Sequence, residues 1–318
     1  MRRRDFIAAL GSAAATSLGA KAQQPRLATV AVLALGNPPP APFMEGLREG
    51  LRAADYVEGR NITLHLRSAE GRSDRLPELA AEIVRSKVDV IVAFLTPAAT
   101  AAKVATGDIP IVMAGVGDPV GTGLVASLAR PGGNVTGTTT GSAEVAGKLV
   151  ELVRELLPTA QRFAVLANET DPFTVPFLRE IERVARVVGL EVHPTMVRPA
   201  APLADAFEGM IAKRAEAVII QGSLVHQDAI DLAMKHRLPL LSGNATVPRL
   251  GGLMSYSAGS YFRETAGYID KLLKGAKPAD LPVSFPSRFE LIVNLKSAKA
   301  LGITIAAMMI SRADEVIE

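Results

Sequence analysis

The chain has 318 residues, 48% of them hydrophobic, with 35 basic and 32 acidic side chains and a formal net charge of +3. Four of the bases and one of the acids lie in residues 1–22, so the remaining chain carries 31 of each and has no basic field to attract nucleic acid or anionic lipid. The absence of cysteine excludes disulfides, thiolate nucleophiles and cysteine-bound metal centres.

Residues 1–22 have the pattern of an export signal. Three arginines at 2–4 precede a weakly apolar stretch at 8–20, and Ala20-Lys21-Ala22 places small residues where signal peptidase cleaves. The apolar stretch is too short to span a bilayer as a helix. Residues 3–7 (RRDFI) resemble the twin-arginine signal, with a Sec signal or a frayed amphipathic terminus as the alternatives. Since no cysteine follows for lipid attachment, we expect a soluble, untethered protein in the periplasm.

Short apolar runs alternate with amphipathic stretches over residues 27–114. The first run, LATVAVLAL at 27–35, is typical of a central parallel strand covered on both faces. We expect strands at 27–35, 61–66, 88–94 and 109–114, and helices at 43–54, 75–86 and 97–104. This alternation predicts a parallel, doubly wound sheet.

The alternation restarts after Gly141 and then becomes less regular. We expect helices at 143–156, 175–188, 203–213 and 225–235, and strands at 163–167, 191–196, 217–221 and 238–241. Later elements are strand-like stretches at 251–256, 282–285 and 290–295 and helices at 261–273 and 295–301, the last ended by Gly302.

A tail this long after two complete α/β units indicates that the chain crosses back between them, and we place crossings near 138–142, 257–260 and 285–289. The predicted fold class is therefore α/β, with two doubly wound parallel-sheet lobes joined by a multi-crossing hinge. Lobe 1 is expected from 23–139 plus about 258–286, and lobe 2 from 140–257 plus about 287–318.

Five stretches resemble the ABC-transporter substrate-binding family that includes tryptophan- and tyrosine-type binders. They are 118–137 (DPVGTGLVASLARPGGNVTG), 251–256 (GGLMSY), 273–280 (LKGAKPAD), 294–302 (NLKSAKALG) and 312–318 (RADEVIE). The resemblance runs from about residue 27 to the end. It implies a type I periplasmic-binding fold, a ligand in the cleft between the lobes, and ATP hydrolysis by separate subunits.

Ligands of doubly wound sheets sit beyond the carboxyl ends of the strands, near helix N-termini. The expected ligand-binding residues therefore follow the predicted strands. In the first unit they are Gly36, Asn37, Thr96, Pro97, Ala98, Ala99, Val116 and Asp118. In the second they are Asn168, Asp171, Phe173, Ser223 and Asn244, and Tyr256 lies at a predicted crossing.

Two residues of the first unit, Thr96 and Asp118, each have two possible roles at a predicted helix start. Thr96 at an N-cap with Pro97 behind it opens a helix whose free N–H groups can hold a carboxylate, or Thr96 only caps its own helix. Asp118 before Pro119 is typical of a helix cap, but its carboxylate can also pair with a ligand ammonium group.

In the second unit, Thr170 or Asp171 is expected to cap the helix from Val175, Phe173 to form an apolar wall, and Ser223 to cap the helix from Val225. The spacing of Ser223, His226 and Asp228 superficially suggests a hydrolytic triad. Three residues so close on one helix cannot align as nucleophile, base and orienter.

Gly222 departs from the resembling amino-acid binders, which tend to carry Asp there. Losing that carboxylate removes a partner for an α-ammonium group, and the segment Ser242–Thr246 is also smaller and more polar than is usual. We therefore predict a carboxylate ligand without a free amino group.

The sequence predicts no cofactor, no metal and no catalysis. Dinucleotide and ATP fingerprints are absent and the four histidines are dispersed. The function we expect is the extracytoplasmic solute-binding component of an ABC importer: a monomer that captures a small organic carboxylate or amino-acid-like molecule and works with permease and ATPase subunits. The alternatives are the ligand-sensing domain of a receptor system and an exported α/β enzyme.

Overall fold

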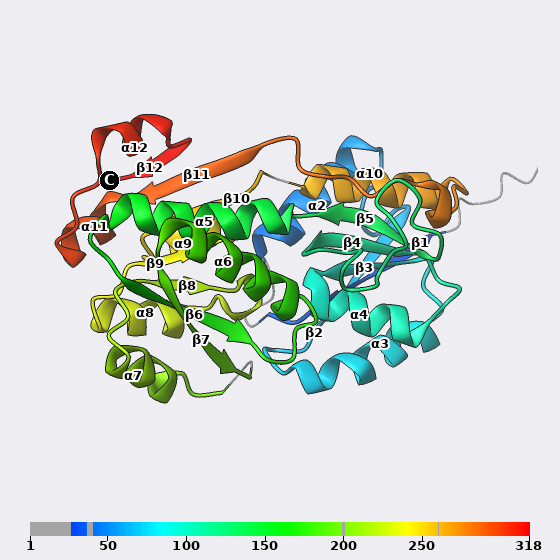
Figure 1. The fold of residues 1–318 in the computed structure, drawn as a ribbon. Helices are drawn as coiled ribbons and strands as arrows, with labels where there is room; N and C mark the ends of the chain where they lie inside the picture. The colour runs from blue at the N-terminus through cyan, green and yellow to red at the C-terminus, as the bar shows by residue number, and fades with distance from the viewer. Residues whose placement is uncertain (1–26, 37–40, 199–200, 260) are drawn as a thin grey trace, which may run out of the picture.

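The computed structural model describes residues 27–36, 41–198, 201–259 and 261–318. The predicted export signal and the candidate Asn37 lie outside these residues. Two sheets stand side by side (Figure 1), one of five strands in the order β2-β1-β3-β4-β5 and one of seven in the order β12-β11-β10-β9-β8-β6-β7. We call each sheet with its helices a lobe, lobe 1 holding the five-stranded sheet and lobe 2 the seven-stranded one. The predicted two-lobed α/β fold is confirmed.

Lobe 1 is a parallel sheet with helices on both faces. Its elements are β1 (Ala28–Ala34), α2 (Ala41–Ala53), β2 (Ile62–Ser68), α3 (Leu76–Arg85), β3 (Val90–Phe94), α4 (Leu95–Ala105), β4 (Ile111–Val116) and β5 (Val135–Thr139). Alternate residues of β1 enter two separate cores: Val30 and Val32 pack on one face, Ala31 and Leu33 on the other. Burial on both faces explains why this strand is a continuous apolar run.

Lobe 2 repeats the alternation and adds a C-terminal extension. Its elements are α5 (Ser142–Leu156), β6 (Arg162–Asn168), α6 (Thr174–Val188), β7 (Glu191–Val197), α7 (Ala204–Ala212), β8 (Val218–Ile220), α8 (Gln227–Lys235), β9 (Leu240–Ser242), α9 (Thr246–Arg249), β10 (Met254–Ala258), β11 (Phe289–Asn294), α11 (Leu295–Leu301), α12 (Ala307–Arg312) and β12 (Glu315–Ile317). The pairing of β10 with β11 is antiparallel, whereas the other pairs in this sheet are parallel.

Four of the described helices and strands were not expected from the sequence, and one expected strand is wrong. The unexpected ones are β5, α9, α12 and β12. The segment expected as a strand at 282–285 makes only an isolated bridge from Ser284 to Thr138.

The chain returns to lobe 1 after β10. Helix α10 (Phe262–Leu273) lies beside α2 over the lobe 1 sheet (Figure 1). The two helices meet closely at Gly50, where an added Cβ would lie 2.7 Å from the Cβ of Ala266. Lobe 1 is therefore built from two separate parts of the chain.

The turn from β5 into α5 passes through Gly141, at one of the connections between the lobes. Gly141 has φ +63°, and an added Cβ would lie 2.8 Å from the ring of Phe289 and 3.1 Å from that of Phe285. Both its backbone conformation and its crowded surroundings require glycine.

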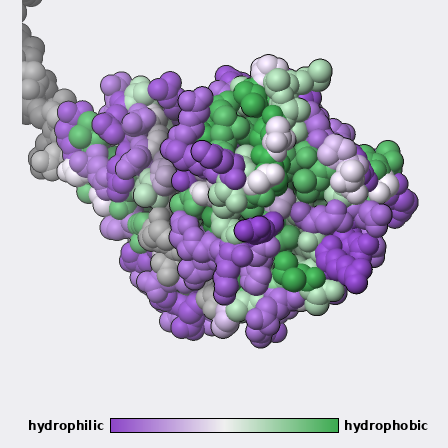
Figure 2. Space-filling model, turned by 90° about the vertical axis from the view of Figure 1, so that its left-hand side faces the viewer, coloured by the Kyte–Doolittle hydropathy of each residue, from purple (hydrophilic) through white to green (hydrophobic). Residues whose placement is uncertain are grey.

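The end of the molecule that carries α11, α12 and β12 faces the viewer in Figure 2. Hydrophobic residues gather in the upper part of this face, and hydrophilic residues cover most of the rest. Among the described helices, none combines the length and apolar character needed to cross a bilayer.

Replacing Asn294 with alanine is expected to destabilise lobe 2 by about 1 kcal/mol, because this residue is the N-cap of α11. Its Oδ1 accepts the N–H of Ser297 at 2.9 Å and its Nδ2 donates to the carbonyl of Pro248 at 2.7 Å. Urea unfolding measures the change, with the exposed Lys296→Ala in the same helix as the control. Equal stability of the two variants would contradict the capping role.

Candidate ligand-binding site

The carboxyl ends of the two sheets meet at a seam between the lobes. The Oγ of Ser73, ahead of α3, lies 2.9 Å from the Oγ1 of Thr170, which follows β6. The ring of Phe173 lies so close to Gly117, which follows β4, that a Cβ at Gly117 would be 2.7 Å from ring atoms. These two contacts hold the strand ends of lobe 1 against those of lobe 2.

Thr96 does not cap its own helix, so that expectation is wrong. Helix α4 begins one residue earlier, at Leu95, whose φ of +67° turns the chain sharply out of β3. The Thr96 hydroxyl instead accepts the N–H of Gly117 at 3.2 Å and ties two strand ends together. A left-handed leucine is strained, and such strain at a strand end is typical of functional sites.

The rest of this helix start is buried. Pro97 is buried, and Ala98 and Ala99 are 0% exposed. Ala98 and Ala99 therefore pack in the lobe 1 core, and neither residue offers an exposed group to a ligand in this structure.

Val116 and Asp118 hold the loop after β4. Val116 is buried, and its carbonyl accepts the N–H of Thr140 at 3.0 Å and the hydroxyl of Thr139 at 2.8 Å. The expected helix cap at Asp118 is wrong, because its Oδ1 accepts the N–H of Gly121 at 2.8 Å within a turn.

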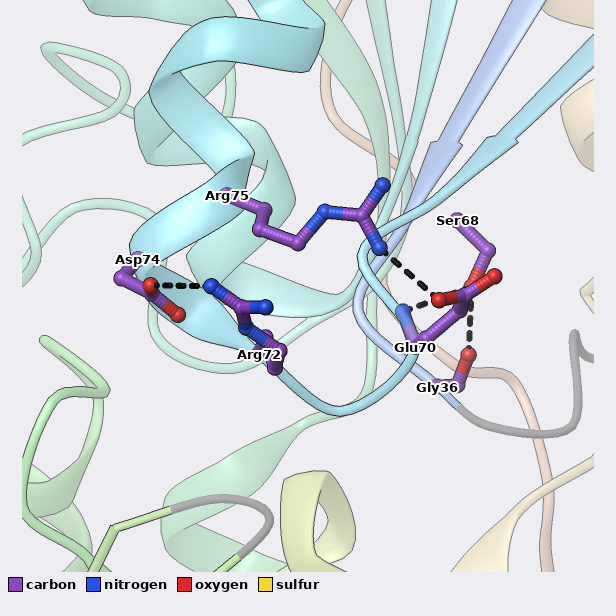
Figure 3. A network of polar contacts seen from close by, with 6 residues as sticks. All are labelled: Gly36, Ser68, Glu70, Arg72, Asp74 and Arg75. Atoms are coloured by element: carbon purple, nitrogen blue, oxygen red, sulfur yellow. Dashed lines mark hydrogen bonds and ion pairs between the residues drawn. The ribbon is translucent and has the colours of Figure 1, made fainter.

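Gly36 follows β1 and lies in a polar loop (Figure 3). Its carbonyl accepts the hydroxyl of Ser68 at 2.5 Å, and Ser68 Oγ in turn accepts the N–H of Glu70 at 3.1 Å. Two ion pairs follow in the figure, Arg75 to Glu70 at 2.8 Å and Arg72 to Asp74 at 3.0 Å. The hydrogen bond from Arg72 also lowers the pKa of Asp74. These contacts shape the loop that carries Ser73.

Six polar residues at the carboxyl ends of β6 and β8 form a hydrogen-bonded group that we call the seam cluster. They are Asn168, Thr170, Asp171, Thr174, Gln221 and Ser223. Gln221 lies at the centre. Its Oε1 accepts the N–H of Asn168 and the hydroxyl of Thr174, both at 2.8 Å, and its Nε2 donates to Asp171 Oδ2 at 2.9 Å. Satisfied buried networks of this kind are rigid.

The cluster fixes the direction of the bond across the seam. Asn168 Oδ1 accepts the N–H and the hydroxyl of Thr170, at 2.9 and 2.8 Å. The Thr170 hydroxyl has one hydrogen and donates it to Asn168 Oδ1. The Ser73 hydroxyl is therefore the donor in the hydrogen bond to Thr170.

Ser223 is not a helix cap, contrary to expectation. It lies in a 3-10 turn, Gly222–Leu224, and α8 begins only at Gln227. Its Oγ donates to Asp171 Oδ2 at 3.0 Å and accepts from Asn168 Nδ2 at 3.2 Å.

Asp171 is 6% exposed and accepts three hydrogen bonds. Oδ1 accepts the N–H of Phe173 at 2.9 Å, so the carboxylate shapes the turn before α6 and does not cap Val175 as expected. Burial raises the pKa of Asp171 to about 6, although the bonds from Phe173 and Ser223 act in the opposite direction.

The last two candidates belong to lobe 2 but not to the seam cluster. Asn244 Oδ1 accepts the N–H and hydroxyl of Thr246, at 3.0 and 2.8 Å, at the start of α9. The ring of Tyr256 stacks on Phe289 with centroids 5.5 Å apart and packs against the lobe 2 core.

A groove of about 960 Å³ begins at the seam and runs between α3 and α4. Lobe 1 contributes Pro97 and Thr100 among others, and lobe 2 contributes Thr170, Pro172 and Arg198. The groove is therefore bounded by both lobes.

Sequence reasoning missed two residues that make the seam, Ser73 and Gln221. It placed Gly117 at a strand end but did not predict that the ring of Phe173 lies against it. Gln221 had a usable signal, because a polar residue ending an apolar strand has to find buried partners. Among the described side chains, no group of three His, Asp or Glu is placed to hold a metal ion.

Replacing Ser73 with alanine is expected to weaken ligand binding about 2- to 10-fold, the value of one neutral hydrogen bond across the seam. Titration calorimetry measures the change. The control is Ser86→Ala, since the exposed Ser86 hydroxyl bonds only the Glu82 carbonyl of its own helix. The role of Ser73 in closure is refuted if both variants bind alike.

The sequence and the fold are both similar to those of known proteins. Residues 30–317 match the model of the family described as ABC transporter substrate binding protein. A tyrosine-binding protein of Clostridioides difficile is 28% identical over 269 residues, which cover 81% of this chain and 75% of that protein.

Two solved structures are similar over nearly the whole chain. A conserved domain protein from Vibrio cholerae has a TM-score of 0.85 and 28% identity, covering 92% of this chain and 100% of that one. The ABC domain from Streptococcus pneumoniae in complex with L-Trp has a TM-score of 0.82 and 27% identity, covering 91% and 99%. The fold is that of type I periplasmic binding proteins, and the chain belongs to the family of ABC transporter substrate-binding proteins.

Proposed function

We propose that this protein is the extracytoplasmic solute-capture component of an ABC importer, closing its two lobes on a small organic acid or amino-acid-like molecule. The observation that carries the proposal is the loop after β6. It contacts lobe 1 twice, through Thr170 to Ser73 and through Phe173 to Gly117, beside the strand ends where doubly wound folds bind ligands.

The chemistry of the seam supports this ligand class. Phe173 is half-buried and lies 5.5 Å from Phe177, so it offers an apolar wall. The relatives named for tyrosine and solved with L-Trp bind ligands that combine a carboxylate with an apolar body.

The proposal includes export without lipid attachment, action as a monomer, and delivery to permease and ATPase subunits. It includes no catalytic step. Ser223, the hydroxyl that sequence spacing placed near His226 and Asp228, donates to Asp171, an arrangement that supports a structural and binding role.

A thermal-shift screen of small carboxylates and amino acids tests the function. A ligand at 100 times its Kd stabilises a protein by about 2.7 kcal/mol, which is a readable shift. We expect stabilisation by at least one such solute and closure on binding, seen as a smaller radius of gyration in X-ray scattering. Turnover of a substrate without stabilisation by any solute would overturn the proposal.

A further inference from the structure

Helices α3 and α4 lie side by side on one face of the lobe 1 sheet (Figure 1), and the groove between them leads away from the seam. It reaches Arg85 and Ala105, the last residues of the two helices. Asp89, four residues beyond Arg85, exchanges hydrogen bonds of 2.8 Å with Thr29 at the start of β1. The outer end of the groove therefore lies beside the amino ends of the strands, opposite the cleft where the captured solute is expected.

Helix α4 turns an apolar face to this groove. Its eleven residues carry one charge, that of Lys103, which donates to the carbonyl of Leu124 at 3.0 Å and does not line the groove. Val104 in the groove wall is 85% exposed. The hydroxyl of Thr100 is buried and has no hydrogen-bond partner among the described residues, so this residue does not present its hydroxyl to the groove. Surface helices usually turn polar residues outward, and an apolar outer face indicates a binding surface.

The charges of the groove favour an anion at its outer end. Three of its lining residues are charged, Asp74, Arg85 and Arg198. Asp74 is paired with Arg72 at 3.0 Å, and Arg198 is paired with Glu169. Arg85 is exposed, and the described part of the chain holds no ion-pair partner for it. The groove thus combines an apolar wall with one available cation.

The size of the groove suits a small molecule. Its volume of about 960 Å³ lies within the range of small-molecule sites, about 300–1,000 Å³, which are mostly apolar and occur where domains meet. Nine of its fifteen lining residues are alanine, valine, leucine or proline. From Pro97 to Ala105 the helix rises by about 12 Å, which leaves room for an extended chain along α4.

We propose that the α3–α4 groove is a second binding site, for a linear carboxylate with an apolar chain. The chain lies along α4 against Val104, and the carboxylate lies at Arg85. This site goes beyond solute capture, because it lies on the flank of lobe 1 and not at the strand ends. An occupant that reaches Pro172 also contacts lobe 2, so it favours the arrangement in which the lobes are together.

The first test is titration calorimetry with hexanoate, octanoate and decanoate, each below the concentration at which it forms micelles. Affinity should rise about two- to fourfold for each added methylene that becomes buried. Decanoate should bind about two- to fivefold more tightly than decyltrimethylammonium, the value of an exposed ion pair with Arg85.

Two substitutions in the groove have matched controls on α6. Val104→Asp should weaken decanoate binding at least about tenfold, because it places a carboxylate in the apolar wall. Its control is Val187→Asp, at a valine that is 76% exposed and outside the groove. Arg85→Gln should remove the preference for decanoate over the ammonium probe, whereas Arg186→Gln, also in the last turn of its helix, should keep it. Urea unfolding checks that all four variants are folded.

Each contrary outcome identifies a different error. No binding of decanoate by wild type, or equal loss in Val104→Asp and Val187→Asp, would overturn the site. A dimer in sedimentation that Val104→Asp converts to a monomer would assign the groove to a second copy of the chain instead. Solute capture is tested separately, because Val104→Asp should leave the affinity of a solute bound in the strand-end cleft unchanged.

Discussion

Replacing Gly117 with alanine is expected to weaken ligand binding by about 5- to 150-fold, because the added Cβ would lie 2.7 Å from ring atoms of Phe173 across the seam. Gly117 does not have a positive φ, so alanine introduces no backbone strain. The effect is a steric clash that opposes closure of the lobes. Either the lobes stay apart or Phe173 moves, and the cost in free energy is about 1–3 kcal/mol, as for an overpacked contact.

A double-mutant cycle separates this contact from other effects of Gly117→Ala. In a Phe173→Ala background the same substitution should cost less than about twofold, because the opposing ring is gone. Gly222→Ala is the matched control, since an added Cβ there meets nothing within 4 Å. An undiminished loss in the Phe173→Ala background would show that Gly117 acts within lobe 1 and not across the seam.

Between pH 4 and pH 7.5, wild type is expected to lose about 2 kcal/mol of unfolding free energy relative to Asp171→Asn, since each unit of pKa shift corresponds to about 1.4 kcal/mol. The folded protein holds this proton up to a pKa of about 6, whereas an unperturbed aspartate carboxyl has a pKa of 3.8. An acid whose pKa is raised by folding is favourable when protonated, so its contribution to stability falls as the pH rises from about 4 to about 6. Asparagine is uncharged throughout and avoids that loss.

Urea unfolding of both proteins between pH 4 and pH 8 measures the difference. The unfolding free energy of Asp171→Asn minus that of wild type should rise from pH 4 to about pH 6 and stay constant above it. At pH 4 this difference already contains the cost of the hydrogen bonds that asparagine cannot accept, because it replaces one acceptor oxygen with a donor. A difference that does not change with pH would contradict the raised pKa of Asp171.

The fold could be predicted because its core strands are buried on both faces. Runs such as 30–35 and 90–94 are apolar throughout, and their alternation with helices leaves few other arrangements. Strand β5 was missed for the opposite reason. Its residues are Val-Thr-Gly-Thr-Thr, all buried, and its threonine hydroxyls bond distant groups such as the carbonyls of Leu281 and Val116.

The site could be predicted only as a set of strand ends. Thr96 and Ser223 were expected to cap their own helices, which is the local use of a hydroxyl at such a position. In the structure their partners are Gly117 and Asp171, 21 and 52 residues away in the chain. Neighbouring residues in the sequence do not indicate such distant partners. Which strand ends lie next to each other, and so which partners these side chains find, depends on the order of the strands in each sheet.

The return of the chain to lobe 1 through α10 has a consequence for the order of folding during synthesis. Lobe 1 needs Phe262–Leu273 to cover the α2 side of its sheet, and lobe 2 needs Phe289–Asn294 to complete its own. A nascent chain that has left the ribosome only as far as β9 can therefore finish neither lobe. Contacts between such distant segments form late and slowly. Both halves should reach their native state together, after the C-terminal segment has been made.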